Sequence, residues 1–303
     1  MLAYNYSYQI VFDDPAAAYP ALSRASELAK AGLAELPEDA LALTLAFADY
    51  AQGNRTATGA RKLRRVLKER DAAGAPATQD SARIWLALAV DDITARRYKE
   101  AAESGDLASL AIAAALPDDI KAHAYALVIS GVGHIMPRPR TAASVNAARV
   151  IFEKAVMLYP PQESILAFDE TLANAYAWTV VSRSALLSIG KADAISEGAD
   201  EDDKAFDHEL IKDDYKCEVK WEDRKPPVYP RGALYKGYLG GVIVGYNIGD
   251  DGKPKDARIF SEVPAAQFGA AAVKAMAAWK LKEDVAPECR NNRITKFVFY
   301  MDE

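Results

Sequence analysis

Two kinds of hydrophobic pattern divide the chain into two parts. Between Pro15 and about Ile195, long runs rich in Ala and Leu predict a series of helices. From Val242 onward, side chains alternate with a period of two over short stretches, which predicts β-strands. The chain is therefore expected to combine an all-α N-terminal region with a small α+β domain at its C-terminal end.

The C-terminal pattern predicts the order strand, hairpin turn, strand, helix, strand. Residues 242–248 alternate with a period of two, Asp251 and Gly252 supply turn chemistry, and a second strand follows over about residues 255–263. Residues 265–278 are predicted as a helix because their apolar side chains recur at spacings of three and four. These side chains are Phe268, Ala272, Ala275, Met276 and, just beyond, Trp279. Residues 293–300, rich in β-branched and aromatic side chains, are predicted as the last strand.

The helical region shows a rough internal period. Pro37, Pro76, Pro117 and Pro160 are 39, 41 and 43 residues apart, and each precedes a run of helical character. Each helix pair would expose an apolar face that only its neighbour can cover, so a solenoid or bundle of about eight helices is expected. The segment from His134 to Arg140 contains two prolines and is predicted as a loop. Its arginines Arg138 and Arg140 could contact a partner or belong to a solvated connection.

Charge and length exclude some classes of protein and mark a linker. The chain has 303 residues and a net charge of −6, which argues against a nucleic-acid partner. Residues 196–214 carry nine acidic side chains and two lysines and are expected to form an acidic linker. The expected domains are therefore residues 1–195, the linker 196–214 and residues 215–303. No run of 18 apolar residues and no secretory signal is visible in the sequence.

The sequence offers no candidate active site. The three histidines are scattered, and no metal-ligand pair, phosphate-cradling glycine loop or nucleophile elbow occurs. We therefore expect a protein without catalytic, cofactor-binding or metal-binding residues, whose function lies in contact surfaces.

The C-terminal part resembles the C-terminal domain of TonB, the periplasmic energy transducer of Gram-negative bacteria. The resemblance covers about residues 226–300, a quarter of the chain. It rests on features that occur in the right order: the Pro227-x-Tyr229-Pro230 entry, the Gly237 and Gly240 spacing, the Asp251-Gly252 turn, the helix from Phe268 to Trp279 and the last strand. About residues 19–187 also resemble tetratricopeptide-type repeats. A repeat-like helical array outside that family stays an equal alternative, because the period exceeds the family's usual length.

The resemblance implies a binding mode. In the TonB family the last strand pairs with a short segment, the TonB box, of an outer-membrane transporter. Carried onto this chain, the partner-binding residues are Pro227, Tyr229, Pro230, Arg293, Ile294, Thr295, Lys296, Phe297, Val298, Phe299 and Tyr300. Pro226 stands where well-studied members have a Gln that helps recognise the transporter. The same edge could instead be covered by the preceding segment from Cys217 to Trp221, or by a second copy in a homodimer.

The resemblance also bears on the compartment and the cysteines. Because the family is periplasmic, a periplasmic location and a disulfide between Cys217 and Cys289 are expected. Complete transducers carry a membrane helix and a Pro-rich spacer ahead of this domain. Either such a segment has been removed from this chain, or the chain is a soluble relative.

Two functions from different classes follow. In the first, the protein is a non-enzymatic, TonB-like energy-transduction module that engages a TonB-dependent transporter, while the helical repeats bind another, unknown partner. In the second, the helical region is a tetratricopeptide-like scaffold, and the TonB-like domain is structural or self-associating.

Overall fold

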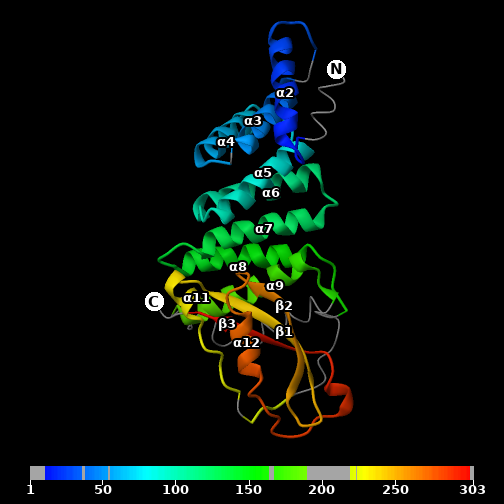
Figure 1. Cartoon of the computed structure of the whole chain (residues 1–303), viewed down its shortest axis with the longest axis vertical. Coiled ribbons are helices and arrows are strands. Elements are labelled where there is room, and N and C mark those ends of the chain that lie inside the picture. Colours follow the sequence, from blue (N-terminus) through cyan, green and yellow to red (C-terminus); the bar gives the residue numbers. More distant parts are fainter. Residues whose placement is uncertain are drawn as a thin grey trace. The chain divides into compact units, whose positions relative to one another are not determined.

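The computed structural model describes residues 11–35, 38–53, 55–163, 167–189, 219–222 and 224–300 (Figure 1). Its described residues divide into two compact units. One unit comprises residues 1–96 and 104–119, and the other comprises residues 97–103 and 120–303. We refer to them as the N-terminal unit and the C-terminal unit. The acidic residues 196–214 lie outside the described residues, so the expected linker stays a prediction.

Helices make up the described residues from Pro15 to Ser188. They are α2 (Pro15–Lys30), α3 (Glu38–Gln52), α4 (Ala57–Ala72), α5 (Gln79–Thr94), α6 (Tyr98–Ala115), α7 (Ile120–Ile135), α8 (Ala142–Met157) and α9 (Glu170–Ser188). Polar side chains at the helix starts accept hydrogen bonds from backbone N–H groups that have no partner within the helix. At α8 the Thr141 side chain accepts from the N–H of Ser144, and the Ser144 side chain accepts from the N–H of Thr141. Successive helices pack on one another, with α2 on α3 and α7 on α8. The all-helical prediction and its repeat-like arrangement are confirmed.

In the N-terminal unit a buried ion pair lies within an apolar core. Large buried side chains such as Leu63 and Trp85 fill the space between the helices. Among them, the Arg64 guanidinium of α4 is paired with the fully buried carboxylate of Asp92. Ser104 Oγ accepts from Arg64 Nε at 3.2 Å and donates to Asp92 at 3.1 Å. Because a buried charge is costly without a partner, these three residues fix how α4, α5 and α6 pack.

In the C-terminal unit, glycines bring α7 close to its neighbours. A Cβ at Gly131 would lie 2.4 Å from the ring of Phe152 on α8. A Cβ at Gly133 would lie 2.5 Å from the backbone nitrogen of Ala102 at the start of α6. Any side chain at either position would therefore push the helices apart.

The C-terminal domain follows the predicted order, with a short helix added before the first strand and a 3-10 helix before the last strand. The short helix α11 (Arg231–Lys236) precedes β1 (Gly240–Ile248), β2 (Pro254–Val263), α12 (Gly269–Met276), the 3-10 helix η3 (Pro287–Cys289) and β3 (Arg293–Phe299). The helix predicted over 265–278 is too long at both ends. It begins late because the Glu262 carboxylate accepts the N–H groups of Gln267 and Phe268, which holds these residues in a turn.

The strands form one antiparallel sheet in the order β2-β1-β3, so β1 is central. Alternate residues of β1 face opposite sides. Val242, Val244 and Tyr246 pack in one core with α12 residues such as Ala272 and Met276. Ile243 lies in the other core, with residues of α9.

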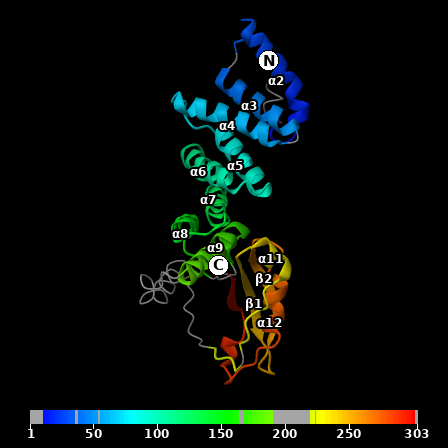
Figure 2. The ribbon, with the colours of Figure 1, turned by 90° about the vertical axis from the view of Figure 1, so that its left-hand side faces the viewer.

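The second face of the sheet is covered by α9, the last helix of the helical region (Figure 2). A Cβ added at Gly241 of β1 would lie 2.7 Å from Val181 Cγ2 of α9, so helix and strand approach as closely as a glycine permits. Ser261 of β2 donates to Asn174 Oδ1 of α9 at 2.9 Å. The sheet therefore lies between α9 and α12 within one compact unit.

Candidate protein-binding edge

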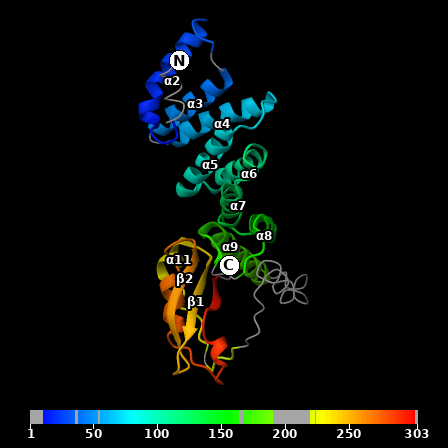
Figure 3. The ribbon, with the colours of Figure 1, turned by 90° about the vertical axis from the view of Figure 1, so that its right-hand side faces the viewer.

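The strand β3 forms one margin of the sheet (Figure 3). It pairs with β1 in an unbroken register from Gly240 opposite Phe299 to Tyr246 opposite Arg293. On its other side, no strand pairs with β3 within the part of the chain that the structure describes. A regular strand with one unpaired side offers a row of N–H and C=O groups to an extended peptide.

The opposite margin, β2, is irregular. Its pairing with β1 shifts register twice, between Ile243 and Val244 and again between Gly245 and Asn247. It begins at Pro254, and Asp256 has a positive φ of 55°. Register shifts, proline and charged side chains are features that discourage pairing at a sheet edge. Of the two margins, β3 is the one with an unbroken register.

The side chains of β3 alternate between the two covered faces. Thr295, Phe297 and Phe299 point toward α12 and are at most 7 % exposed. Ile294, Lys296 and Val298 point toward α9 and are half-buried. The predicted site residues 293–299 therefore lie on one strand, and Tyr300 follows directly with 44 % of its surface exposed. Because the faces are covered, the edge offers mainly backbone to a partner.

The segment before the domain does not pair with β3 where it is described. Trp221 forms a bridge with Leu281, and the backbone N–H of Glu222 donates to the carbonyl of Lys280 at 2.9 Å. Its described contact with β3 is a side-chain bond from Arg224 to Thr295 Oγ1 at 3.0 Å. The described lead-in thus runs along the residues after α12. Cys217 lies outside the described residues, so its disulfide with Cys289 stays a prediction.

Among the predicted entry residues, Tyr229 packs against β3 on the side of the sheet that faces α12. The ring of Tyr229 contacts Phe268 and Phe299 edge-on, with centroids 5.7 and 5.8 Å apart. Its hydroxyl donates to the carbonyl of Tyr238. Burial raises the pKa of the Tyr229 phenol, and the charges of Arg140 and Arg138 partly offset that rise. Pro227 is half-buried, and Pro230 is the residue before α11.

The loop after α7 also holds the domain. Arg138 and Arg140 both donate to the carbonyl of Gly237, at 3.0 and 2.8 Å. Gly237 ends α11 in the left-handed conformation with φ 62°, and the Arg138 guanidinium lies where its Cβ would be. The described role of these arginines is a contact within the chain, which neither of the two readings had named. The sequence offered no signal for this contact, because the two segments lie about 100 residues apart.

Positive side chains lie along β3. Arg293 and Lys296 belong to the strand, and Arg224 is fixed beside it on Thr295. Burial raises the pKa of Tyr246 on the α12 face, and the charges of Arg293 and Arg224 partly offset the rise, so both cations lie near its phenol.

The described ranges contain neither a metal-ligand cluster nor a membrane-spanning helix. No cluster of three His, Cys, Asp or Glu side chains in those ranges could hold a metal ion. None of the described helices combines the length and the apolar character needed to cross a membrane.

The described fold is a small α+β domain: a hairpin, a packing helix and a last strand that has no described strand on its outer side. Residues 225–299 match the family model described as Gram-negative bacterial TonB protein C-terminal, which makes this part of the chain a TonB C-terminal domain. The suspected family is confirmed over that range. A search of curated proteins finds no match to the chain.

Proposed function

We propose that this domain accepts the TonB box of a TonB-dependent outer-membrane transporter as a fourth strand along the outer side of β3. The observation that carries the proposal is that β3, in a domain of the TonB C-terminal family, pairs regularly with β1 and has no second partner strand among the described residues. Each backbone hydrogen bond gained would contribute about 0.5–1.5 kcal/mol net. Several such bonds along the seven residues of β3 suffice for a specific, reversible complex.

The rest of the proposal concerns the chain as a whole. Residues 1–195 form a helical-repeat domain that binds a second protein, residues 196–214 connect it, and residues 215–303 form the transporter-binding domain. The protein works in the periplasm and has no catalytic activity. The family match supports the compartment and the non-enzymatic role. A disulfide between Cys217 and Cys289 belongs to this proposal, because both cysteines flank the domain.

A second candidate is a scaffold in which the TonB-like domain is structural. The observation that favours it is the packing of α9 on the sheet through Gly241 and the Ser261–Asn174 hydrogen bond. In this case the domain would extend the helical array and would not act as an independent binder. Self-association through β3 would be its expected use of the edge.

The deciding experiment is calorimetric titration of the full chain with TonB-box peptides from transporters of the same bacterium. A control peptide carries proline at alternate positions, which removes the amide donors that a strand needs. Saturable binding of the first peptide alone supports strand addition. Binding of neither peptide, together with a dimer by light scattering, would favour the scaffold.

A further inference from the structure

A polar groove of about 270 Å³ lies between α7 and α9 in the C-terminal unit. It is lined by Tyr125 and Val128 of α7 and by Glu170, Thr171 and Asn174 from the first two turns of α9. Pockets that hold drug-sized ligands usually enclose about 300–1,000 Å³. The groove is therefore better suited to one long side chain, with the backbone next to it, than to a larger small molecule.

The groove carries a negative charge. Among the residues that the structure describes, no side chain forms an ion pair with Glu170, and none hydrogen-bonds to the hydroxyl of Tyr125 or Thr171. Lys121 of α7 is paired with Asp169 at 3.2 Å, so this neighbouring pair adds no net charge. The Glu170 carboxylate thus sets the sign of the charge that a ligand meets.

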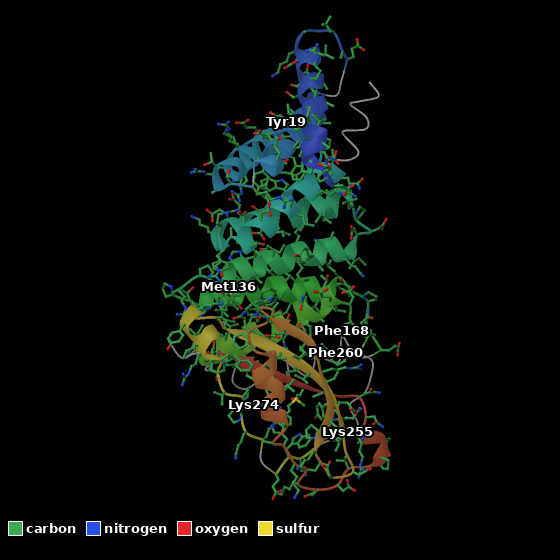
Figure 4. All side chains as sticks on the ribbon, viewed as in Figure 1. Tyr19, Met136, Phe168, Lys255, Phe260 and Lys274 are labelled. Atoms are coloured by element: carbon green, nitrogen blue, oxygen red, sulfur yellow. The ribbon has the colours of Figure 1, made fainter. Side chains whose placement is uncertain are left out.

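The TonB-like domain fixes the orientation of one groove residue. The hydroxyl of Ser261 on β2 donates to Asn174 Oδ1 at 2.9 Å. Because this bond engages the amide oxygen, the NH₂ group of Asn174 is the part that can donate to a ligand. Phe168, just before α9, and Phe260 of β2 pack against the same apolar cluster, which adds to the contact between α9 and β2 (Figure 4).

The α7 side of the groove offers an aromatic ring and an apolar floor. Tyr125 is 41 % exposed, whereas Val128 is 8 % exposed. Burial of the Tyr125 phenol, together with the charge of Glu170, raises its pKa above the ordinary 10.0, so the phenol is neutral at physiological pH. The face of a neutral tyrosine ring attracts a cation.

These groups complement the parts of a lysine or arginine residue. The cation of such a residue would lie between the Glu170 carboxylate and the Tyr125 ring. Its hydrocarbon stem would pack on Val128, and its backbone carbonyl would accept a hydrogen bond from Asn174.

We infer that this groove binds an extended segment of another protein through a lysine or arginine side chain of that segment. The inference rests on the proposed binding of a second protein by the helical region, and it adds the place and the chemistry of that contact. It is independent of strand addition at β3.

The test uses the full chain and three peptides, acetyl-Ala-Ala-X-Ala-Ala-amide, in which X is lysine, norleucine or glutamate. In an NMR titration, the lysine peptide should bind about five- to tenfold more tightly than the norleucine peptide, because it gains one ion pair and one cation–ring contact. The glutamate peptide should bind most weakly. Added salt should reduce the advantage of lysine over norleucine.

Matched variants assign this advantage to the groove. Glu170→Gln keeps the size of the side chain but removes its charge, and should reduce the advantage to about twofold. Tyr125→Leu should weaken binding of the lysine peptide by about two- to fivefold. Glu283→Gln removes an exposed carboxylate elsewhere in the same unit and should leave the advantage unchanged. The melting temperature of each variant checks that the fold is retained.

Equal affinity of the lysine and norleucine peptides, or binding of neither, would overturn this inference. Strand addition would be left standing, because the TonB-box titration tests it separately, and so would the binding of a second protein elsewhere on the helices. An advantage that survives Glu170→Gln but falls with Glu283→Gln would also overturn the inference, because the cation would then bind at another place.

Discussion

The two outer strands of the sheet pair with the same central strand, β1, but differ in the regularity of that pairing. The strand β3 pairs with β1 in an unbroken register, whereas β2 shifts register twice and starts at a proline. The irregular strand β2 is tied to the helical region through the Ser261–Asn174 bond. The regular strand β3 is supported from the α12 side by Trp279 and Tyr229. One margin thus anchors the domain, and the other is the margin that we propose binds a partner.

The largest expected effect comes from removing the support of β3. Trp279 is 1 % exposed and contacts Phe297 of β3, with ring centres 5.5 Å apart. Trp279→Ala leaves a cavity beneath β3 and should lower the free energy of unfolding by about 3–5 kcal/mol. Denaturant unfolding followed by fluorescence measures this free energy of unfolding. The matched change on β2, Ile259→Ala, should cost less than about 1 kcal/mol because this side chain is 43 % exposed. Equal losses would contradict the asymmetry.

A smaller effect is expected where the α7–α8 loop meets the domain. Gly237→Ala places a side chain at φ 62° and against the Arg138 guanidinium. An L-residue in this conformation costs about 1–2 kcal/mol, so the melting temperature should fall. Gly232→Ala is the control within the same helix, since a Cβ there meets nothing within 4 Å. If both variants have the same melting temperature, the contact of Arg138 with Gly237 does not contribute to stability.

The anchor of β2 should show a coupling of intermediate size. In a double-mutant cycle with Ser261→Ala and Asn174→Ala, the interaction free energy should be about 0.5–1.5 kcal/mol, as for one hydrogen bond. Chemical denaturation of the wild type, both single variants and the double variant gives this quantity. A coupling of zero would mean that α9 is not held to β2 through this bond.

The smallest effect concerns Tyr246 beside Arg293. Its pKa is raised above the ordinary 10.0 because the phenol is buried. The unfolded chain therefore loses this proton at lower pH than the folded protein. The contribution of the protonated Tyr246 phenol to stability is complete below pH 10. It is lost as the pH rises through the pKa that this phenol has in the folded protein.

The matched variants separate this contribution from other alkaline effects. Between pH 9 and 11, the unfolding free energy of the wild type should fall more steeply than that of Tyr246→Phe. Tyr235→Phe, at a position 87 % exposed, should follow the wild type. Identical slopes for the wild type and Tyr246→Phe would show that burial does not hold this proton.

Local sequence patterns predicted most elements of the C-terminal domain. The period-two alternation of residues 242–248 and the Asp251-Gly252 turn predicted the hairpin, and the β-branched run from Arg293 predicted β3. The helix was predicted too long because nothing in its own apolar spacing shows that Glu262 caps residues 267 and 268 from the preceding strand. The short helix α11 was missed, since six residues carry too little periodicity.

Contacts between segments that lie far apart in the chain could not be predicted from the sequence. The packing of α9 on the sheet depends on the Val181 side chain and the Ala177 carbonyl oxygen, which approach Gly241 more than 50 residues later in the sequence. One signal was present: α9 carries small or apolar residues on every side, as helices buried all round do. The site residues of β3 were named from family resemblance. Whether the lead-in covers this edge depends on contacts between distant segments, which no local pattern encodes; the described lead-in residues do not pair with β3.

Hydrogen exchange of the full chain, with and without a saturating TonB-box peptide, tests the central claim most directly. If a partner strand adds to β3, amides within residues 293–299 should exchange more slowly in the complex, while those of residues 254–263 on β2 should not change. Unchanged exchange along β3, or new protection along β2, would contradict the account.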